Sequence, residues 1–109
     1  MVALNARTGA KVPGFGREGE VNLRHGVADE FPDAVYAETS PPAILDDLVL
    51  TGAEVPESPG QGPRGDVRAW DVRTGKLAWT FHTVPVDGEP GRETWEGDSG
   101  RLANNLPPD

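Results

Sequence analysis

Short apolar runs separated by polar turn residues dominate the middle of the chain. In order, the runs are Ala43–Leu45, Leu48–Thr51, Asp66–Asp71 and Leu77–His82. In the last run, the large side chains of Leu77, Trp79 and Phe81 alternate with smaller ones, as expected of a strand with two unequal faces. The runs predict four consecutive antiparallel strands. No window keeps the apolar spacing of three and four that a helix needs, and prolines interrupt most candidates.

A segment near the N-terminus recurs 66 residues later, because Ala3–Val12 and Ala69–Trp79 share Ala, Asn or Asp, Arg, Thr and Gly at the same offsets. Each copy predicts a strand, a tight turn at the Asn-x-x-Thr-Gly or Asp-x-x-Thr-Gly segment, and the start of a second strand. In the turn, the Asn or Asp side chain can bond the backbone and the glycine accepts a positive φ. Both copies therefore predict a hairpin. Four-stranded units that repeat along a chain are typical of a β-propeller, in which small twisted sheets stack face to face.

The predicted fold is all-β, a fragment of about one and a half four-stranded blades of a β-propeller. Residues 1–12 are interpreted as the end of a preceding blade, 13–42 as a long inter-blade loop, 43–82 as one four-stranded antiparallel blade, and 83–109 as a loop-rich tail. Gly, Pro and acidic residues are frequent in the loop segments.

Composition agrees with a loop-rich piece of a larger protein. Apolar residues are 36% of the chain, and 14 glycines and 11 prolines favour loops over a packed core, so independent stability is expected to be marginal. A net charge of −8 without a basic cluster disfavours nucleic-acid binding. The chain has no cysteine, no apolar stretch near the ~20 residues of a membrane span, and no signal-peptide pattern. We expect it to start inside a structural unit.

The second repeat resembles a known motif. Ala69–Trp79 matches the pattern Ala-x-Asp-x-x-Thr-Gly-Lys-x-x-Trp, the tryptophan-docking repeat of the pyrroloquinoline quinone (PQQ) dehydrogenases. Three further phrases resemble successive segments of the glucose-type and alcohol-type members: Thr39–Pro42, Phe81–Pro85 and Glu93–Asp98. The resemblance implies an eight-bladed periplasmic propeller, with Trp79 packed between blades and with PQQ and a calcium ion on its axis.

The resemblance also implies site residues. Thr39 matches a threonine that bonds the cofactor in alcohol-oxidising members, and the alternative is a strand-entry threonine before two prolines. Thr51 and Gly52 lead into a Gly-Ala-Glu segment in which Glu54 matches a calcium ligand of methanol-type enzymes. For Glu54 the alternative is a solvated loop acid, because the loop after it is longer and richer in proline than in those enzymes.

Other parts of the family pattern are missing. After Glu93–Asp98 the aromatic Gly-rich run of the family is replaced by Ser99–Asp109, and no residue is assigned as the catalytic base. The function implied is that of a fragment, inactive alone, of a PQQ-dependent oxidoreductase. Its substrate would be a glucose-like sugar or an alcohol, and its electron acceptor a quinone or a cytochrome.

Other interpretations remain. A non-catalytic propeller scaffold would share the repeat but has no need of Glu93–Asp98, and a partly disordered interaction segment would lack strands. Gly14–Gly19 matches a dinucleotide-binding fingerprint, but that motif needs a helix at its third glycine. His25 and His82 lie 57 residues apart without cysteine, which disfavours a metal site, and His82 is expected to be partly exposed.

Overall fold

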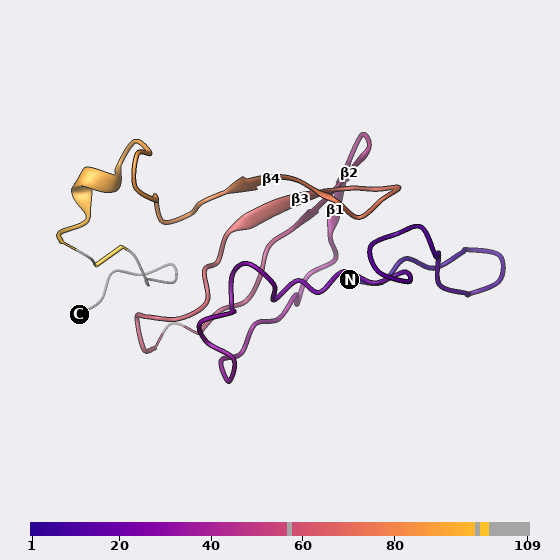
Figure 1. Ribbon diagram of the computed structural model, residues 1–109. Coiled ribbons are helices and arrows are strands. Elements are labelled where there is room, and N and C mark those ends of the chain that lie inside the picture. The colour runs from indigo at the N-terminus through magenta and orange to yellow at the C-terminus, as the bar shows by residue number, and fades with distance from the viewer. Residues whose placement is uncertain (57, 98, 101–109) are drawn as a thin grey trace.

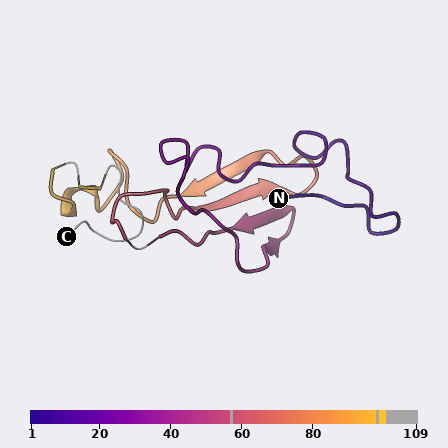
Figure 2. The ribbon, with the colours of Figure 1, turned by 90° about the horizontal axis from the view of Figure 1, so that it is seen from below.

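The computed structural model describes residues 1–56, 58–97 and 99–100, and it contains one four-stranded antiparallel sheet in the order β1-β2-β3-β4. The strands lie side by side as a meander (Figures 1 and 2). Their bounds are β1 Ala43–Leu45, β2 Leu48–Thr51, β3 Val67–Asp71 and β4 Leu77–Phe81. The one helical element of the described residues is a short 3-10 turn, η1, at Arg92–Thr94. It is far too short and too polar to cross a membrane, and no other described segment qualifies. The predicted all-β fold and four-stranded sheet are confirmed, although Asp66 and His82 lie just outside their strands.

The interior strands β2 and β3 carry most of the buried side chains of the sheet. Val49 and Thr51 are buried in β2, and Arg68, Ala69 and Trp70 are buried in β3. The edge strands β1 and β4 stay largely exposed. This contrast follows from the order of the sheet, because an interior strand has a neighbour on each side.

The register of β3 against β4 contains an irregularity. Ala69 pairs with Trp79, but Trp70 pairs with Leu77 instead of Ala78, so one residue of β4 is left over as a bulge. Paired residues share a face of the sheet. The strict alternation predicted for Leu77, Trp79 and Phe81 is therefore wrong at Leu77, which the bulge removes from the row formed by the two aromatic residues.

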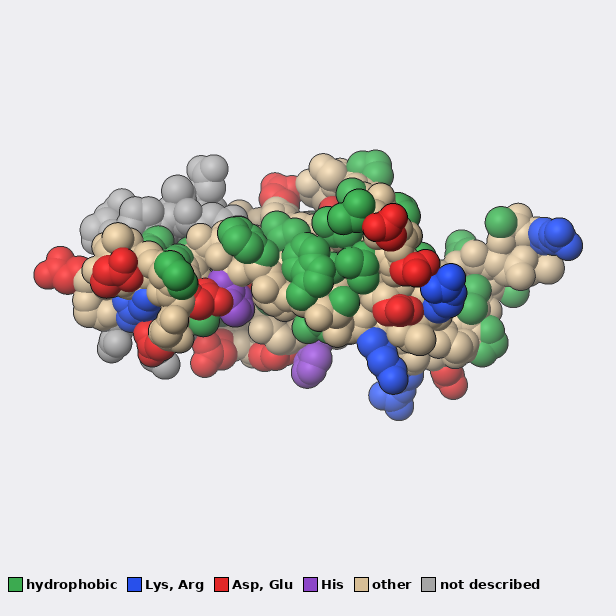
Figure 3. Space-filling model, turned by 90° about the horizontal axis from the view of Figure 1, so that it is seen from above, with side chains coloured by type: hydrophobic (Ala, Val, Ile, Leu, Met, Phe, Trp, Pro, Cys, Tyr) green, Lys and Arg blue, Asp and Glu red, His purple; other side chains and the backbone are tan. Residues whose placement is uncertain are grey.

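The two faces of the sheet differ in cover. On the face shared by Leu45, Trp79 and Phe81, these side chains keep 56%, 41% and 62% of their surface exposed. On the opposite face, Val49 and Trp70 in the interior strands are buried at 7% and 6%, whereas Ile44 and Leu77 in the edge strands keep 63% and 51% of their surface exposed. Figure 3 shows hydrophobic side chains gathered over the middle of the molecule with acidic and basic groups to either side. The face that carries Leu45, Trp79 and Phe81 is therefore apolar and largely uncovered.

The two copies of the repeat form the same turn. The Asn5 Oδ1 atom accepts the backbone N–H of Arg7 and Thr8 at 2.9 and 3.2 Å. In the second copy, Asp71 Oδ1 accepts the N–H groups of Arg73 and Thr74 at 2.9 and 2.8 Å. These bonds lower the pKa of Asp71, chiefly through Thr74 and then Arg73, because they favour the ionised carboxylate. The shared polar side chain thus builds the turn in both places.

The N-terminal segment docks on the second turn. The backbone N–H of Gly16 donates to the Thr74 carbonyl at 2.8 Å. A Cβ atom on Gly75 would lie 2.9 Å from the Gly16 nitrogen, so only glycine allows this approach. The equivalent Gly9 has nothing within 4 Å of such an atom. The turn of the second copy is therefore packed against a neighbouring segment, whereas the space around the turn glycine of the first copy is free.

Candidate functional site

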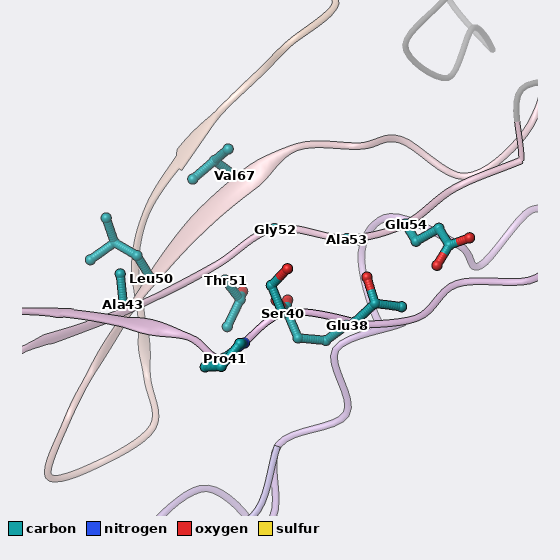
Figure 4. A pocket seen from close by; sticks show the side chains of 11 residues that line it. Glu38, Ser40, Pro41, Ala43, Leu50, Thr51, Gly52, Ala53, Glu54 and Val67 are labelled. Atoms are coloured by element: carbon teal, nitrogen blue, oxygen red, sulfur yellow. The ribbon is translucent and has the colours of Figure 1, made fainter.

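A cavity of about 350 Å³ opens at the end of β2. One wall is the segment that leads into β1, and the other is the end of β2 with the residues that follow it (Figure 4). The lining residues are Glu38, Thr39, Ser40, Pro41, Ala43, Leu50, Thr51, Gly52, Ala53, Glu54 and Val67. Its volume falls in the range of small-molecule sites, which is about 300–1,000 Å³.

A pair of backbone hydrogen bonds ties the two walls together. Ala37 N–H donates to the Glu54 carbonyl at 3.2 Å, and Glu54 N–H donates to the Ala37 carbonyl at 2.6 Å. The two segments therefore run antiparallel at this point. Ser40 directly precedes Pro41, which favours extended backbone at Ser40, and residues 38–40 line the cavity without forming another strand.

The four residues predicted to bind cofactor or metal all line this cavity. Thr39, Thr51, Gly52 and Glu54 come from both walls, so the fold brings together positions that are up to 15 residues apart in the sequence. The Thr51 hydroxyl is engaged, because its Oγ1 accepts Trp70 Nε1–H at 3.0 Å and the residue is 3% exposed. Figure 4 shows the Glu54 side chain at the end of the cavity away from Ala43 and Leu50.

Two polar lining residues were not predicted from the sequence. Glu38 and Ser40 flank Thr39, and their proximity to that residue was the available signal. Burial raises the pKa of Glu38, because partial loss of water disfavours its charged form, while the Gly52 backbone N–H that it accepts acts in the opposite direction. Figure 4 shows the Glu38 side chain close to Ser40 and directed toward the Gly52 wall.

The electrostatics of the cavity are acidic. Glu38 and Glu54 supply two carboxylates, threonine and serine supply hydroxyls, and none of the described lining residues is Lys or Arg. Such oxygen donors suit a hard cation. Across residues 1–56, 58–97 and 99–100, no three acidic or histidine side chains lie close enough together to hold a metal ion.

A second polar cluster lies beyond β4. His82 Nδ1 lies 2.8 Å from Glu89 Oε1, and its Nε2 lies 3.9 Å from Asp66 Oδ2. Arg64 Nε is 3.4 Å from the same Asp66 oxygen, and Asp66 is only 2% exposed. The bond from His82 lowers the pKa of Glu89, with a smaller contribution from the Val86 N–H. His82 is partly exposed, as predicted, and the cluster fastens the segment after β4 to the start of β3.

The sequence pattern of the glucose/ethanol/alcohol dehydrogenase β-propeller domain of the PQQ family matches residues 1–106. This match covers nearly the whole chain, so it includes both copies of the repeat and both walls of the cavity. No solved structure matches the chain significantly.

Several characterised proteins are similar in sequence. The quinate/shikimate dehydrogenase (quinone) of Acinetobacter baylyi is 37% identical over 82 residues, which are 74% of this chain and 10% of that protein. Quinoprotein glucose dehydrogenase A of Acinetobacter calcoaceticus is 36% identical over 97 residues, 86% of this chain and 12% of that protein. The quinohemoprotein alcohol dehydrogenase ADH IIB of Pseudomonas putida is 37% identical over 76 residues, 62% of this chain and 11% of that protein.

The chain thus spans about a tenth of the length of these relatives. The resemblance read from the repeat and its flanking phrases is confirmed by the matched pattern and by relatives of both the glucose and the alcohol type. The chain belongs to the PQQ-dependent glucose/ethanol/alcohol dehydrogenase β-propeller family, of which it is a partial representative.

Proposed function

We propose that this chain forms one blade, with adjoining segments, of a dehydrogenase that oxidises a sugar or an alcohol with PQQ, and that it supplies one wall of the cofactor site. The observation that carries the proposal is the cavity at the end of β2, where Thr39, Thr51, Gly52 and Glu54 meet in a chain of this family. In the complete protein, PQQ would supply a quinone able to take up the hydride of the substrate, and calcium would supply a Lewis acid for its carbonyl.

The donors of the cavity fit this group in part. The Thr39 hydroxyl would bond the cofactor, and Glu54 would give a carboxylate oxygen to calcium. The Thr51 hydroxyl accepts the Trp70 N–H, which fixes its place in the wall, and its own O–H would remain to donate to the cofactor. Calcium takes about six to eight oxygens, so most donors would come from the cofactor and from blades outside this chain.

The uncovered face of the sheet supports a role as part of a larger assembly. Trp79 and Phe81 lie exposed on that face, and a neighbouring blade packed there would bury both rings. We assign no catalytic base to this chain and propose that it is inactive alone. In the complete protein, a quinone or a cytochrome would accept the electrons, and the periplasm would be its location.

A chimera tests this function. The matching 97-residue region of quinoprotein glucose dehydrogenase A of Acinetobacter calcoaceticus is replaced by this chain, and PQQ binding is titrated with and without calcium. We expect calcium-dependent binding, which Glu54→Gln weakens about tenfold or more, whereas the loop substitution Glu30→Gln leaves it unchanged.

The isolated chain serves as the second arm of the test. We expect no dye reduction from it with PQQ and calcium, because the remaining blades are absent. A chimera that folds but does not bind PQQ would contradict the proposed function and favour a scaffold. Turnover by the isolated chain would contradict the inactivity that we propose.

A further inference from the structure

A buried arginine connects the sheet to the loop that leads into the first wall of the cavity. Arg68 of β3 is 3% exposed, and its Nη1 donates to the His25 carbonyl at 3.0 Å. Its Nη2 donates to the Leu23 carbonyl and to the Tyr36 hydroxyl, the latter at 2.9 Å. One side chain therefore forms hydrogen bonds with three residues of the 23–36 loop.

The same guanidinium packs against one aromatic ring of the sheet and one of the loop. Its central carbon lies 4.9 Å from the centre of the Trp70 ring and 5.9 Å from that of Tyr36. Cation–π contacts of this kind gain strength when water is excluded. The two carbonyls and the phenol that accept its hydrogen bonds are neutral, so oriented dipoles and aromatic rings stabilise the charge.

Both walls of the cavity begin next to these contacts. Tyr36 precedes Ala37, whose backbone pairs with Glu54, and Glu38 and Thr39 follow at once. On the other side, Arg68 is the cross-strand partner of Thr51. Trp70, which the guanidinium covers, donates to the Thr51 hydroxyl. Arg68 thus contacts the supports of both walls without lining the cavity itself.

We propose that Arg68 is the positioning residue of this cavity, setting the separation of the 36–40 segment from the end of β2. Lysine cannot replace it, because a single ammonium cannot reach three separate acceptors in the fixed fork geometry of a guanidinium. The role is argued from the geometry of the cavity, and its relevance to catalysis rests on the proposed function.

Amide hydrogen exchange in the full 109-residue chain tests the proposal. The probes are the Ala37 and Glu54 amides, which bridge the walls, and the ladder amides of β3 and β4 serve as the internal reference. In Arg68→Met we expect exchange at the two bridge amides to rise about tenfold or more, with the reference amides changed about threefold or less.

Arg24 provides the matched control. Its guanidinium bonds the carbonyls of Ala34, Phe31 and Pro32, so these hydrogen bonds stay within the loop and do not join it to the sheet. We expect Arg24→Met to leave the bridge amides unchanged. Tyr36→Phe removes only one acceptor of the guanidinium and should raise exchange at the bridge amides by a smaller factor. If Arg68→Met fails to fold, this variant tests the positioning role instead.

The outcomes of these experiments separate the two proposals. Equal loss of protection at the bridge and in the ladder would show Arg68 to be a general stabiliser and would overturn the positioning role. Unchanged bridge amides in Tyr36→Phe and Arg68→Met, or an unprotected bridge in the unmodified chain, would overturn it too. In the chimera, Arg68→Met should weaken PQQ binding about tenfold. A chimera that binds no PQQ rejects the function, while the exchange pattern still decides the role of Arg68.

Discussion

Replacing Trp70 and Trp79 by alanine, one at a time, compares how much the two faces of the sheet contribute to the free energy of unfolding. Trp70 is 6% exposed and Trp79 is 41% exposed, on opposite faces. For a side chain with roughly 250 Å² of surface, this difference in exposure is about 90 Å². At ~25 cal/mol per Å², the difference corresponds to about 2 kcal/mol. Trp70→Ala should cost about 3–5 kcal/mol, whereas Trp79→Ala should cost about 2 kcal/mol less.

Urea unfolding of the 109-residue chain, followed by far-UV circular dichroism, gives both free energies. Acrylamide quenching of Trp70→Phe and Trp79→Phe variants adds an independent measure, since the ring at 79 should be the more accessible. Equal free-energy costs, or a larger cost at Trp79, would mean that this ring is sealed in a self-sufficient core. The interpretation of the chain as one blade with a missing neighbour would then be refuted.

Three further predictions concern the site wall and the repeat. Thr51→Val should cost about 1–3 kcal/mol by urea unfolding because it strands the buried Trp70 N–H, and Thr51→Ser should restore most of it. The lowered pKa of Asp71 stabilises the fold above its ordinary value of 3.8, and this contribution disappears as pH falls through the lower folded value. Asp71→Asn, the amide already used in the first copy, should flatten acid titrations of stability, and an unchanged slope would contradict this. In thermal melts, Gly75→Ala should destabilise the fold by about 1–3 kcal/mol more than Gly9→Ala. Both glycines have φ near +70°, but only a Cβ at Gly75 would meet neighbouring backbone. Equal losses of stability would exclude the docking contact.

The sequence predicted the local elements of this protein well. Apolar runs and turn residues located four strands to within a residue or so, because strand patterns and Asp-x-x-Thr-Gly turns are set by neighbours in the chain. The exception is Leu77, where the bulge depends on how β4 pairs with β3. The predictions for residues 57, 98 and 101–109, including the departure from the family after Glu93–Asp98, lie outside the described residues.

The candidate site was predicted only in part. Thr39, Thr51, Gly52 and Glu54 came from a family resemblance, and the fold places them around one cavity. Glu38 joined them through a contact with Gly52, 14 residues away, which no local pattern specifies. The structure also shows that the Thr51 hydroxyl accepts the Trp70 N–H, a contact across 19 residues that the sequence did not indicate.

The sequence by itself determined which segments are strands, where the chain turns and to which family it belongs, since these depend on side chains close together along the backbone. Only the tertiary structure decided which sheet face is covered and that Arg68 is hydrogen-bonded to the loop that leads into the first wall of the cavity. In the sequence that arginine is one charged residue within a strand, and its acceptors lie 32 to 45 residues away. A buried cation is tolerable only where distant groups converge on it, and such convergence exists only in the folded chain.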